Sequence, residues 1–545
     1  MSRDTLLTPT PIDGSPAQAF ASHRVRANDI ARQYAVDHPL TYSGGEATED
    51  NVLQLIAHLH TVSHDPNFHP PGQPEPSKTL APKMLRQLNK GAGAVGTTVD
   101  EDDGTFLGFG YHIDARPGDY DPALKELMVI AYRYRHLLSD DDFDFILNSL
   151  VPSGLPGANV ASFEKYPLHI RLSIPIITPP SFPKDAPETE NHMLLISSSV
   201  YLINQLFFDR TSDTIYDNND PGNGLTDWLL NYMHTIAQHD FMEFNARPYQ
   251  RYSLHALLNL HEFARDQSIR DAAQILLDYI TVKFAVSSNR QRRIPPFRRL
   301  KKYTNRPDNQ NDLLAAGVEG NDVVVAFFLM YAGPTDANGD PMDRFPAVRA
   351  SEALIAALAP YRPSPAAYTL ALSRDIPAYQ HRFYHGKRPQ FPASGDQAEG
   401  GVEIYYKSPS FLLTAGGMFL NSGYGSDQFT HYAQTAIAQS TTLIPTRADP
   451  RFTQVIRFDA YPDERRAVNT AVHQGFACGA NMRPTVKKIL SESSSRAPAL
   501  TSHNGSPYLS WKGSGNENLN FAPVVIIDAL DLEGMGCMDS VEGLA

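Results

Sequence analysis

The stretch GGVEIYYKSPSFLLTAGGMFLNSGYG (400–425) alternates apolar and polar residues and is interrupted by glycines. A period of two is typical of strands with one buried face, and glycines within such runs mark turns or bulges. The same style continues in TQVIRFDAY (453–461), SPYLSWKG (506–513) and APVVIIDAL (522–530). The sequence therefore predicts an antiparallel, sandwich-like β-domain over residues 395–545.

Upstream of this stretch the apolar residues recur with the period of helices. Amphipathic windows cover residues 16–36, 48–64, 122–138, 225–239, 253–265, 268–286, 311–332 and 348–359. Many helices followed by many strands indicate segregated α and β domains rather than alternating βαβ units. We expect a flexible N-terminus over residues 1–15 and a helical catalytic domain over 16–388. Pairs of antiparallel helices in this domain are compatible with an (α/α) toroid.

Composition limits the classes of protein that the chain can belong to. Its 545 residues are too many for one ordinary core, and 42 % apolar with 20 % charged residues is typical of a folded protein. A net charge of −13 argues against binding nucleic acid or an anionic membrane surface. Only Cys478 and Cys537 occur, so no disulfide framework defines the fold.

The N-terminal sequence has no apolar region of signal-peptide length, and no run reaches the roughly 18 apolar residues of a membrane span. We therefore expect a chain that is cytoplasmic or a mature secreted chain without its leader.

Three polar residues, Glu190, Asn191 and His192, stand where the apolar helical pattern MLLISSSVYLINQLFF (193–208) begins. The N-terminus of a helix favours an anion, because its N–H groups are unpaired and its dipole is positive there. Glu190 has two further explanations, as an acidic residue favoured in a first turn and as a partner that fixes the His192 tautomer. His192 could also be an ordinary helix-end histidine.

A second polar stretch, DFMEFNARPYQRYSLH (240–255), reads mostly as a loop between two helices. It gathers an amide, cations and phenols, which suit β-elimination on a uronic acid. That reaction needs the carboxylate neutralised, a base for the adjacent proton and an acid for the departing glycosidic oxygen. An ordinary connector with surface Arg–Glu pairs is the alternative.

Taken together, TENHMLL (189–195) and EFNARPYQRYSLHALLNLHEFA (243–264) resemble the α/α-toroid polysaccharide lyases. These include alginate and glucuronan lyases and the heparinase II/III-like group, which carry an Asn-His pair at a helix start and a later Arg and Tyr. The resemblance implies an N-terminal toroid, antiparallel β-domains after it, and cleavage of a uronate polymer by β-elimination.

The resemblance also implies roles for four residues. Asn191 would neutralise the uronate carboxylate, and His192 would be the base or its helper. Tyr249 would be the acid, and in a syn elimination also the base, while Arg247 would orient the carboxylate or lower the pKa of the phenol. Arg247 precedes Tyr249 by only two residues, whereas the Arg of these families precedes the Tyr by several. A pairing of Arg247 with Tyr252, or of a distant Arg with Tyr249, therefore stays open, although Tyr252 abuts a helix and could simply pack there.

We expect the partner to be an anionic polysaccharide or oligosaccharide. The residues expected to bind it are Glu190, Glu243, Asn245, Arg251, Tyr252, Trp228, Arg292 and Arg293. Trp228 could stack on a sugar ring, although a tryptophan at helical spacing is more often core. Arg292 and Arg293 belong to RQRRIPPFRRLKK (290–302), which carries seven Lys or Arg in thirteen residues and is either a polyanion-binding rim or a solvated loop.

No cofactor is required by this chemistry, because Asn and Arg side chains can neutralise the carboxylate. The loops DNNDPGNG (217–224) and DANGDPMD (336–343) have Asp/Asn spacing compatible with Ca²⁺, but turn formation explains them better.

Two other functions compete with the lyase. One is a toroid glycoside hydrolase that uses two carboxylates, with candidates Glu190, Asp227, Asp240 and Glu243. The other is a glycan-binding protein without catalytic activity.

Overall fold

The computed structural model describes the helical part of the chain more completely than the part that follows it. The described residues are 15–40, 45–89, 95–99, 106–111, 120–151, 169–170, 186–187, 190–241, 244–245, 250–289, 292–293, 295, 324, 327–328, 331, 350–372, 377–385, 398–407, 411–420, 441–445, 456–460, 470–473, 476–479, 482–485, 502–503, 506–507 and 522–525.

The N-terminal part is mostly helical. Its described α-helices are α1 (Ser15–Asp37), α2 (Glu49–His64), α3 (Ser77–Leu85), α4 (Tyr120–Arg133), α5 (Asp140–Phe145), α7 (Glu190–Thr211), α8 (Leu225–His239), α9 (Gln250–Phe263), α10 (Gln267–Ser287), α13 (Ala350–Leu358) and α14 (Pro365–Leu372). Short helical turns cover η2 (Arg135–Leu137), η3 (Ile146–Leu150) and η5 (Thr214–Tyr216). Most of the amphipathic windows correspond to these helices within a few residues, whereas most of the window 311–332 lies outside the described residues.

Local capping explains where two of these helices begin. Thr48 precedes α2 in an extended conformation, and its side chain accepts a hydrogen bond from the Asn51 N–H. Glu49 and Asp50 then place acidic groups at the positive end of the helix dipole. Ser139 and Asp142 form a capping box at the start of α5.

The helical part also contains short strands that the periodicity did not indicate. They are β1 (Gly45–Glu46), β2 (Leu88–Asn89), β3 (Val95–Val99), β4 (Phe106–Tyr111), β5 (His169–Ile170), β6 (Ala186–Pro187), β7 (Ser288–Asn289) and β8 (Arg292–Arg293). Each pairs with one neighbour only, and β3 with β4 forms the longest hairpin.

The C-terminal part consists of antiparallel strands. A six-stranded sheet has the order β16-β13-β12-β11-β10-β9, and a three-stranded sheet has the order β14-β15-β19. The strands are β9 (Tyr379–His385), β10 (Ala398–Lys407), β11 (Phe411–Leu420), β12 (Thr441–Pro445), β13 (Ile456–Ala460), β14 (Thr470–His473), β15 (Phe476–Gly479), β16 (Met482–Thr485), β17 (Ser502–His503), β18 (Ser506–Pro507) and β19 (Ala522–Val525). Because β9 pairs with β10, the sheet begins before the expected boundary at 388–395.

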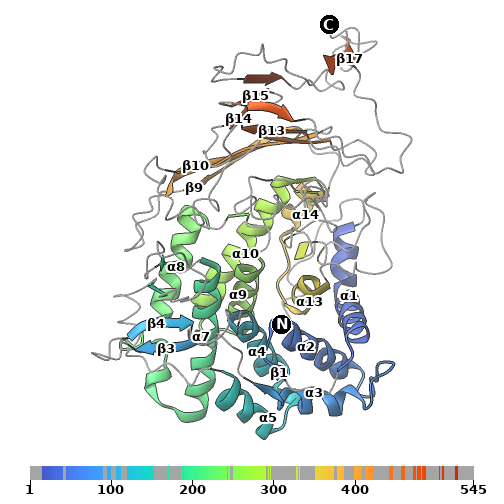
Figure 1. The fold of residues 1–545 in the computed structure, drawn as a ribbon, viewed down its shortest axis with the longest axis vertical. Helices are drawn as coiled ribbons and strands as arrows, with labels where there is room; N and C mark the ends of the chain where they lie inside the picture. The colour runs from blue at the N-terminus through green and yellow to red at the C-terminus, as the bar shows by residue number, and fades with distance from the viewer. Residues whose placement is uncertain are drawn as a thin grey trace, which may run out of the picture.

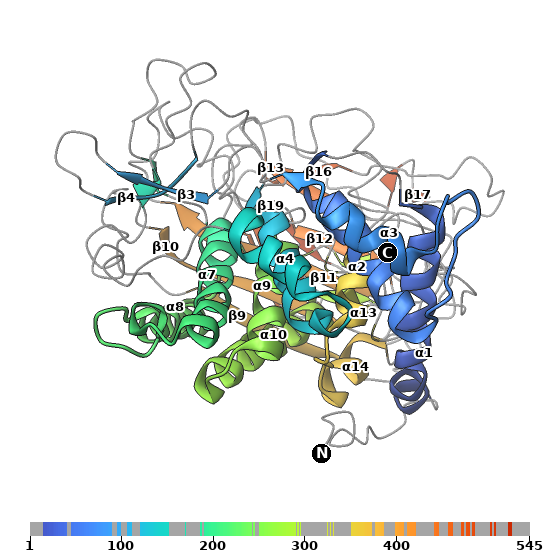
Figure 2. The same ribbon diagram turned by 90° about the horizontal axis from the view of Figure 1, so that it is seen from below.

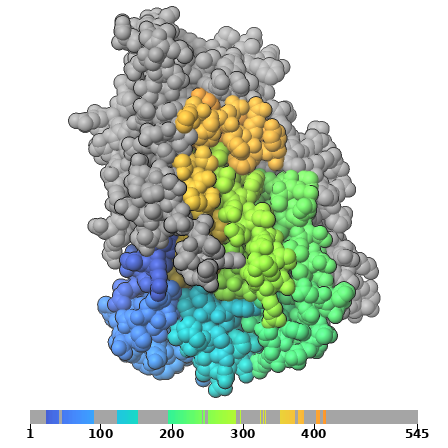
Figure 3. Space-filling view, turned by 180° about the vertical axis from the view of Figure 1, so that it is seen from behind, coloured from blue at the N-terminus to red at the C-terminus, as the bar shows by residue number. Residues whose placement is uncertain are grey.

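The six-stranded sheet lies against one end of the helices (Figure 1). Seen from below, the helices lie in front of the strands of this sheet (Figure 2). From behind, the residues of β9 and β10 (orange) lie against those of α10 (yellow-green) (Figure 3). A buried ammonium fixes this contact: Lys407 on β10 donates to the carbonyls of Ser288 at 3.1 Å and Leu370 at 2.8 Å.

The hydrophobic core runs through the middle of the helices. Along α9 every residue from Tyr252 to His261 is buried, and the described side chains of α7 are buried from Leu194 to Gln205. A helix that is buried on all sides lies inside a bundle rather than on its surface. Among the described residues no helix combines the length and apolarity needed to cross a membrane.

Candidate functional site

Four buried helices, α2, α4, α9 and α13, run parallel. Near their N-terminal ends, Glu49 of α2 binds Lys125 of α4, and Arg251 of α9 binds Glu352 of α13. Near the C-terminal ends of α4 and α9, Arg133 pairs with Glu262. Leu358, the last residue of α13, and Ala359 directly after it line one pocket with that pair, so the end of α13 lies at the same level. The N-termini of these helices therefore meet at one end of the helical part.

The long helix α7 has the same direction. Its Gln205 bonds to the Phe263 carbonyl at the end of α9, and Tyr132 of α4 donates to the Leu202 carbonyl at 2.6 Å. The buried part of α7 precedes these contacts, so α7 packs along α9 in parallel. His192 and Gln250 both precede the Gln205–Phe263 contact by thirteen residues, a rise of about 20 Å. The first turn of α7 is therefore level with the first turn of α9.

A group of charged side chains closes this end, and we call it the ionic layer. Its members are Glu49, Lys125, Glu126, Arg251 and Glu352. Lys125 Nζ lies 3.0 Å from Glu49 Oε1 and 3.1 Å from Glu126 Oε1. The Arg251 guanidinium bridges two carboxylates: it lies 3.0 Å from Glu352 and 3.1 Å from Glu49.

The five members differ in their access to solvent. The side chains of Lys125 and Glu126 are 1 % and 0 % exposed, whereas those of Arg251 and Glu49 are 26 % and 20 % exposed. The exposed part of the layer thus consists of Arg251 and one of its two carboxylate partners, Glu49. The arginine stacks on the Tyr252 ring and donates to the Tyr252 hydroxyl at 2.8 Å.

Burial separates the pKa values of two carboxyls in the layer. Desolvation raises the pKa of Glu126 well above its ordinary value, and Lys125 offsets only part of this effect. Glu126 Oε2 is buried and has no hydrogen-bond partner. Desolvation alone would raise the pKa of Glu49 as well, but Lys125 and Arg251 outweigh it and hold that pKa below its ordinary value. The layer therefore combines a carboxyl that favours its neutral form with one that favours its charged form.

Glutamine substitutions should reveal this difference as opposite effects on stability. The folded state binds a proton at Glu126 more tightly than the unfolded state, so wild-type stability falls as pH rises above the ordinary carboxyl pKa of 4.5. Glu126→Gln should therefore raise the free energy of unfolding at pH 7, with the gain vanishing as pH falls through 4.5.

Glu49 contributes stability above pH 4.5 that is lost as pH falls through its lower folded pKa. Glu49→Gln should cost about 1–3 kcal/mol at pH 7 and progressively less in acid. Urea unfolding of both variants from pH 3 to 8 measures the two effects, and effects of equal sign at pH 7 would contradict this account of the layer.

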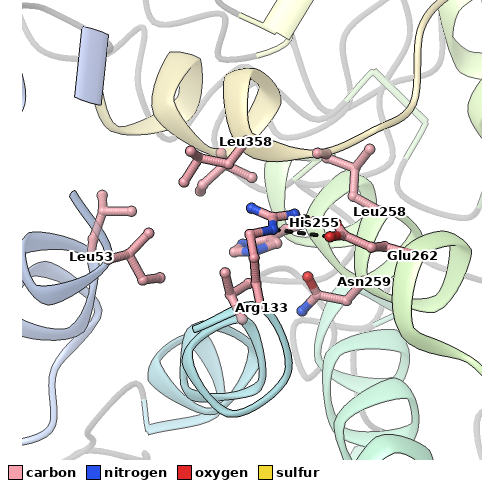
Figure 4. Close-up of a pocket in the computed structure, with 11 residues that line it drawn as sticks. Leu53, Arg133, His255, Leu258, Asn259, Glu262 and Leu358 are labelled. Carbon is pink, nitrogen blue, oxygen red and sulfur yellow. Dashed lines mark hydrogen bonds and ion pairs between the residues drawn. The ribbon is translucent and has the colours of Figure 1, made fainter. Parts of the chain in front are cut away.

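A small pocket lies between helices α2, α4, α9 and α13, beside the Arg133–Glu262 ion pair (Figure 4). It begins about one turn from the ionic layer, because Leu53 and His255 follow Glu49 and Arg251 by four residues each. Leu53, His255 and Ile355 line it, together with the Arg133–Glu262 ion pair. His255 Nδ1 is buried without a hydrogen-bond partner, and burial and then the nearby cations hold the His255 pKa well below its ordinary value. The pocket has room for roughly one water molecule, too little for a sugar ring.

None of the four residues expected to be catalytic has a described side chain. Arg247 and Tyr249 lie outside the described residues, as does Glu243. Glu190, Asn191 and His192 form the first residues of α7, but their side chains are not described. The structure thus places the backbone of the Asn-His pair at the end where the helix N-termini meet.

Arg251 and Tyr252 belong to the first turn of α9, because this helix begins at Gln250 rather than near 253. Arg251 is a member of the ionic layer. Tyr252 is 6 % exposed and packs beneath Arg251 and Lys125. Its hydroxyl thus supports the layer.

The expected sugar-binding residues Asn245 and Trp228 lie elsewhere. Asn245 is fully buried and donates to Glu403 of β10 at 2.7 Å. Trp228 is half-buried on α8 and stacks on Tyr232 at the edge of the core. Arg292 and Arg293 form the short strand β8, and their side chains, like most of the basic segment, lie outside the described residues.

Of the four carboxylates proposed for the competing hydrolase, only Asp227 and Asp240 have described side chains, and these two do not form a pair. Asp227 is exposed on the first turn of α8, whereas Asp240 is buried in an ion pair with Lys283. In the loop 217–224, Asp217 accepts from the Asn219 N–H and Asp220 from the Gly222 N–H, as expected of turns. Within the described residues no group of three or more His, Cys, Asp or Glu side chains is arranged to hold a metal ion. The loop 336–343 lies outside that part of the chain.

The sequence did not indicate the ionic layer apart from Arg251. Lys125 and Glu126 interrupt an otherwise apolar helix, DPALKELMVIAY (121–132), which is the one local signal for buried charge. Glu49 reads as a favoured first-turn acid, and the acid Glu352 likewise stands in the first turn of α13.

No family model matches the chain, and no match was found among curated proteins or solved structures.

Proposed function

We propose that the protein is a polysaccharide lyase that cleaves a uronic-acid-containing polysaccharide by β-elimination. The observation that carries this proposal is the parallel, level packing of α7 and α9. It puts the helix start with Asn191 and His192 at the same end as the helix that follows Tyr249 directly in the chain. The positive ends of α2, α4 and α13 meet at this end too, which favours an anionic substrate.

In the proposed reaction, Asn191 and Arg247 neutralise the uronate carboxylate and make the proton on the adjacent carbon removable. His192 or Tyr249 takes this proton, and the electron pair forms a carbon–carbon double bond as the glycosidic C–O bond breaks. The Tyr249 hydroxyl gives its proton to the departing oxygen. Because Arg251 is already held by Glu49 and Glu352, the ionic layer supports the floor of the site and leaves neutralisation to Asn191 and Arg247.

The architecture we propose for this site is an (α/α) toroid with a β-sandwich after it. In support, α2, α4, α7, α9 and α13 are parallel and buried, while α10 returns antiparallel to α9 after a tight connection. For the sandwich, β14 of the three-stranded sheet contacts β10 and β11 of the larger one. The basic residues 290–302, including Arg292 and Arg293, would form a rim for the polyanion.

Incubation with alginate, polyglucuronate and heparin-type polymers tests the function directly. A lyase generates a conjugated, unsaturated uronate, so ultraviolet absorbance should rise together with new chain ends. New reducing ends without this absorbance would indicate hydrolysis, and polymer binding without either signal would indicate a glycan-binding protein. Either result would overturn the lyase proposal.

One observation favours hydrolysis as a second candidate. Glu49 and Glu126 have pKa values displaced in opposite directions, which is the pattern of a catalytic base and acid. Against this, Glu126 is 0 % exposed, so a glycosidic oxygen could not reach it in this arrangement. We therefore rank the hydrolase second.

A further inference from the structure

We propose that Glu403 of β10 and Lys283 of α10 are positioning residues that hold the loop 240–249 in place for catalysis. The link to catalysis rests on the proposed function, because this loop carries Arg247 and Tyr249. The link to the loop rests on a buried set of five side chains that we call the loop clamp: Asp240, Asn245, Lys283, Glu403 and Tyr405.

The loop clamp joins three separate parts of the chain. Lys283 Nζ lies 2.6 Å from Glu403 Oε1 and also pairs with Asp240 at the end of α8. The second oxygen of Glu403 accepts from Asn245 Nδ2 at 2.7 Å and from the Tyr405 hydroxyl. One carboxylate of the sheet thus binds helix α10 and the loop together.

All the charges of the loop clamp are desolvated. The side chains of Lys283, Asp240 and Glu403 are 2 %, 1 % and 0 % exposed. Burial alone would lower the pKa of Lys283, but Asp240 and Glu403 outweigh it and raise that pKa. Removing one buried partner leaves the others uncompensated, so the positions of all three are tightly coupled.

The backbone of the loop is strained at the two points that the clamp holds. Asp240 has φ 66° and ψ 173°, a region that is essentially restricted to glycine, and Asn245 has φ 50°. The Asp240 carboxylate bonds Lys283 and also accepts from the Phe241 N–H at 2.7 Å. Strained residues persist where surrounding contacts over-determine them, and such residues cluster at functional sites. The side chains of both residues contact the clamp, because Asp240 pairs with Lys283 and Asn245 donates to Glu403.

The clamp does more than attach the sheet to the helices. Lys407, two residues beyond Tyr405 on the same strand, bonds the Ser288 and Leu370 carbonyls and does not involve the loop. The chain therefore offers a matched pair of buried sheet–helix contacts, of which one includes the loop and the other does not.

The test compares Glu403→Gln with Lys407→Met in the full-length protein by amide hydrogen exchange. In Glu403→Gln, exchange over residues 241–250 should be about tenfold faster or more, because the charge-assisted contacts of the loop are weakened. In Lys407→Met, exchange in the loop should stay at the wild-type rate. Asn245→Gly, which keeps the positive φ and the buried ions, should loosen the loop in the same way. The proposal would be overturned if the loop exchanged at the same rate in Glu403→Gln and Lys407→Met. It would also be overturned if exchange in Asn245→Gly were no faster than in the wild type.

The catalytic part of the test measures kcat and KM on whichever polyuronate gives the absorbance signal. A positioning role predicts that Glu403→Gln lowers kcat at nearly unchanged KM, and that Glu403→Asp recovers part of the loss. Unchanged kcat in Glu403→Gln would refute the role in catalysis. If the wild-type protein has no lyase activity, the proposed function fails, while the exchange measurement still decides whether the clamp holds the loop.

Discussion

Lys283→Met is expected to lower the free energy of unfolding by about 3–5 kcal/mol, because it leaves two buried carboxylates without their ammonium. Methionine has a similar length and fills the same space, so the loss reports charge rather than a cavity. Both partners are almost completely buried, and the hydrogen bonds that Glu403 accepts from Asn245 and Tyr405 do not replace the lost positive charge. Urea unfolding at pH 7 measures the change.

The pH dependence of this loss provides its control. A buried carboxylate that has lost its cation is less costly in its neutral form than in its charged form. The deficit of Lys283→Met should therefore shrink as pH falls, and the triple variant Lys283→Met, Asp240→Asn, Glu403→Gln should recover much of the lost stability at pH 7. If Lys283→Met lowered the free energy of unfolding by less than about 1 kcal/mol, the range of exposed ion pairs, the loop clamp would be open to solvent.

Sequence periodicity predicted the helices of the N-terminal part and the antiparallel strands after it, because periodicity reports burial of one face. The window 225–239 coincides with α8, and 268–286 lies within one residue of α10. The sequences of short strands such as β3 (VGTTV) and β4 (FLGFGY) do not alternate regularly between apolar and polar residues, so alternation did not reveal them. The switch from helices to antiparallel strands was also visible, although β9 begins the sheet earlier than expected.

The buried charge contacts of the loop clamp were less predictable than the helices and strands, because they depend on pairing between distant segments. In GGVEIYYK (400–407) the alternation indicates a strand but not which face meets the helices. One face carries Val402, Ile404 and Tyr406, and the other carries Glu403, Tyr405 and Lys407. Hydrophobicity alone favours placing the first set against the helices, yet the structure places the charged set there. Lys283 and Asp240 make this possible, and they stand more than a hundred residues upstream.

The same reasoning explains why Arg251 was found but its partners were not. A cation in a polar segment stands out locally, and so does the Asn-His pair at a helix start. The carboxylates that bind Arg251 lie about 200 residues before it and 100 after it, and only the parallel packing of α2, α9 and α13 unites them.

Tyr249→Phe is expected to reduce kcat for polyuronate cleavage by about 10²- to 10⁴-fold, the range for loss of one positioned proton-transfer group. The change removes only the phenolic oxygen, so binding through Asn191 and Arg247 should persist and KM should change little. The initial rate of ultraviolet absorbance at saturating polymer gives kcat, and binding of polymer to the inactive variant can be measured by calorimetry.

Tyr252→Phe is the matched control, three residues along the same segment. Its hydroxyl is engaged by Arg251 at 2.8 Å in a buried position, so its loss should cost about 1 kcal/mol of stability. Its effect on kcat should be small, because this phenol is buried and bonded within the ionic layer. If Tyr252→Phe abolished cleavage while Tyr249→Phe retained it, the acid would be Tyr252, and substrate would have to displace Arg251 to reach it. The pair of variants therefore decides whether the ionic layer only supports the site or also supplies the group that transfers the proton.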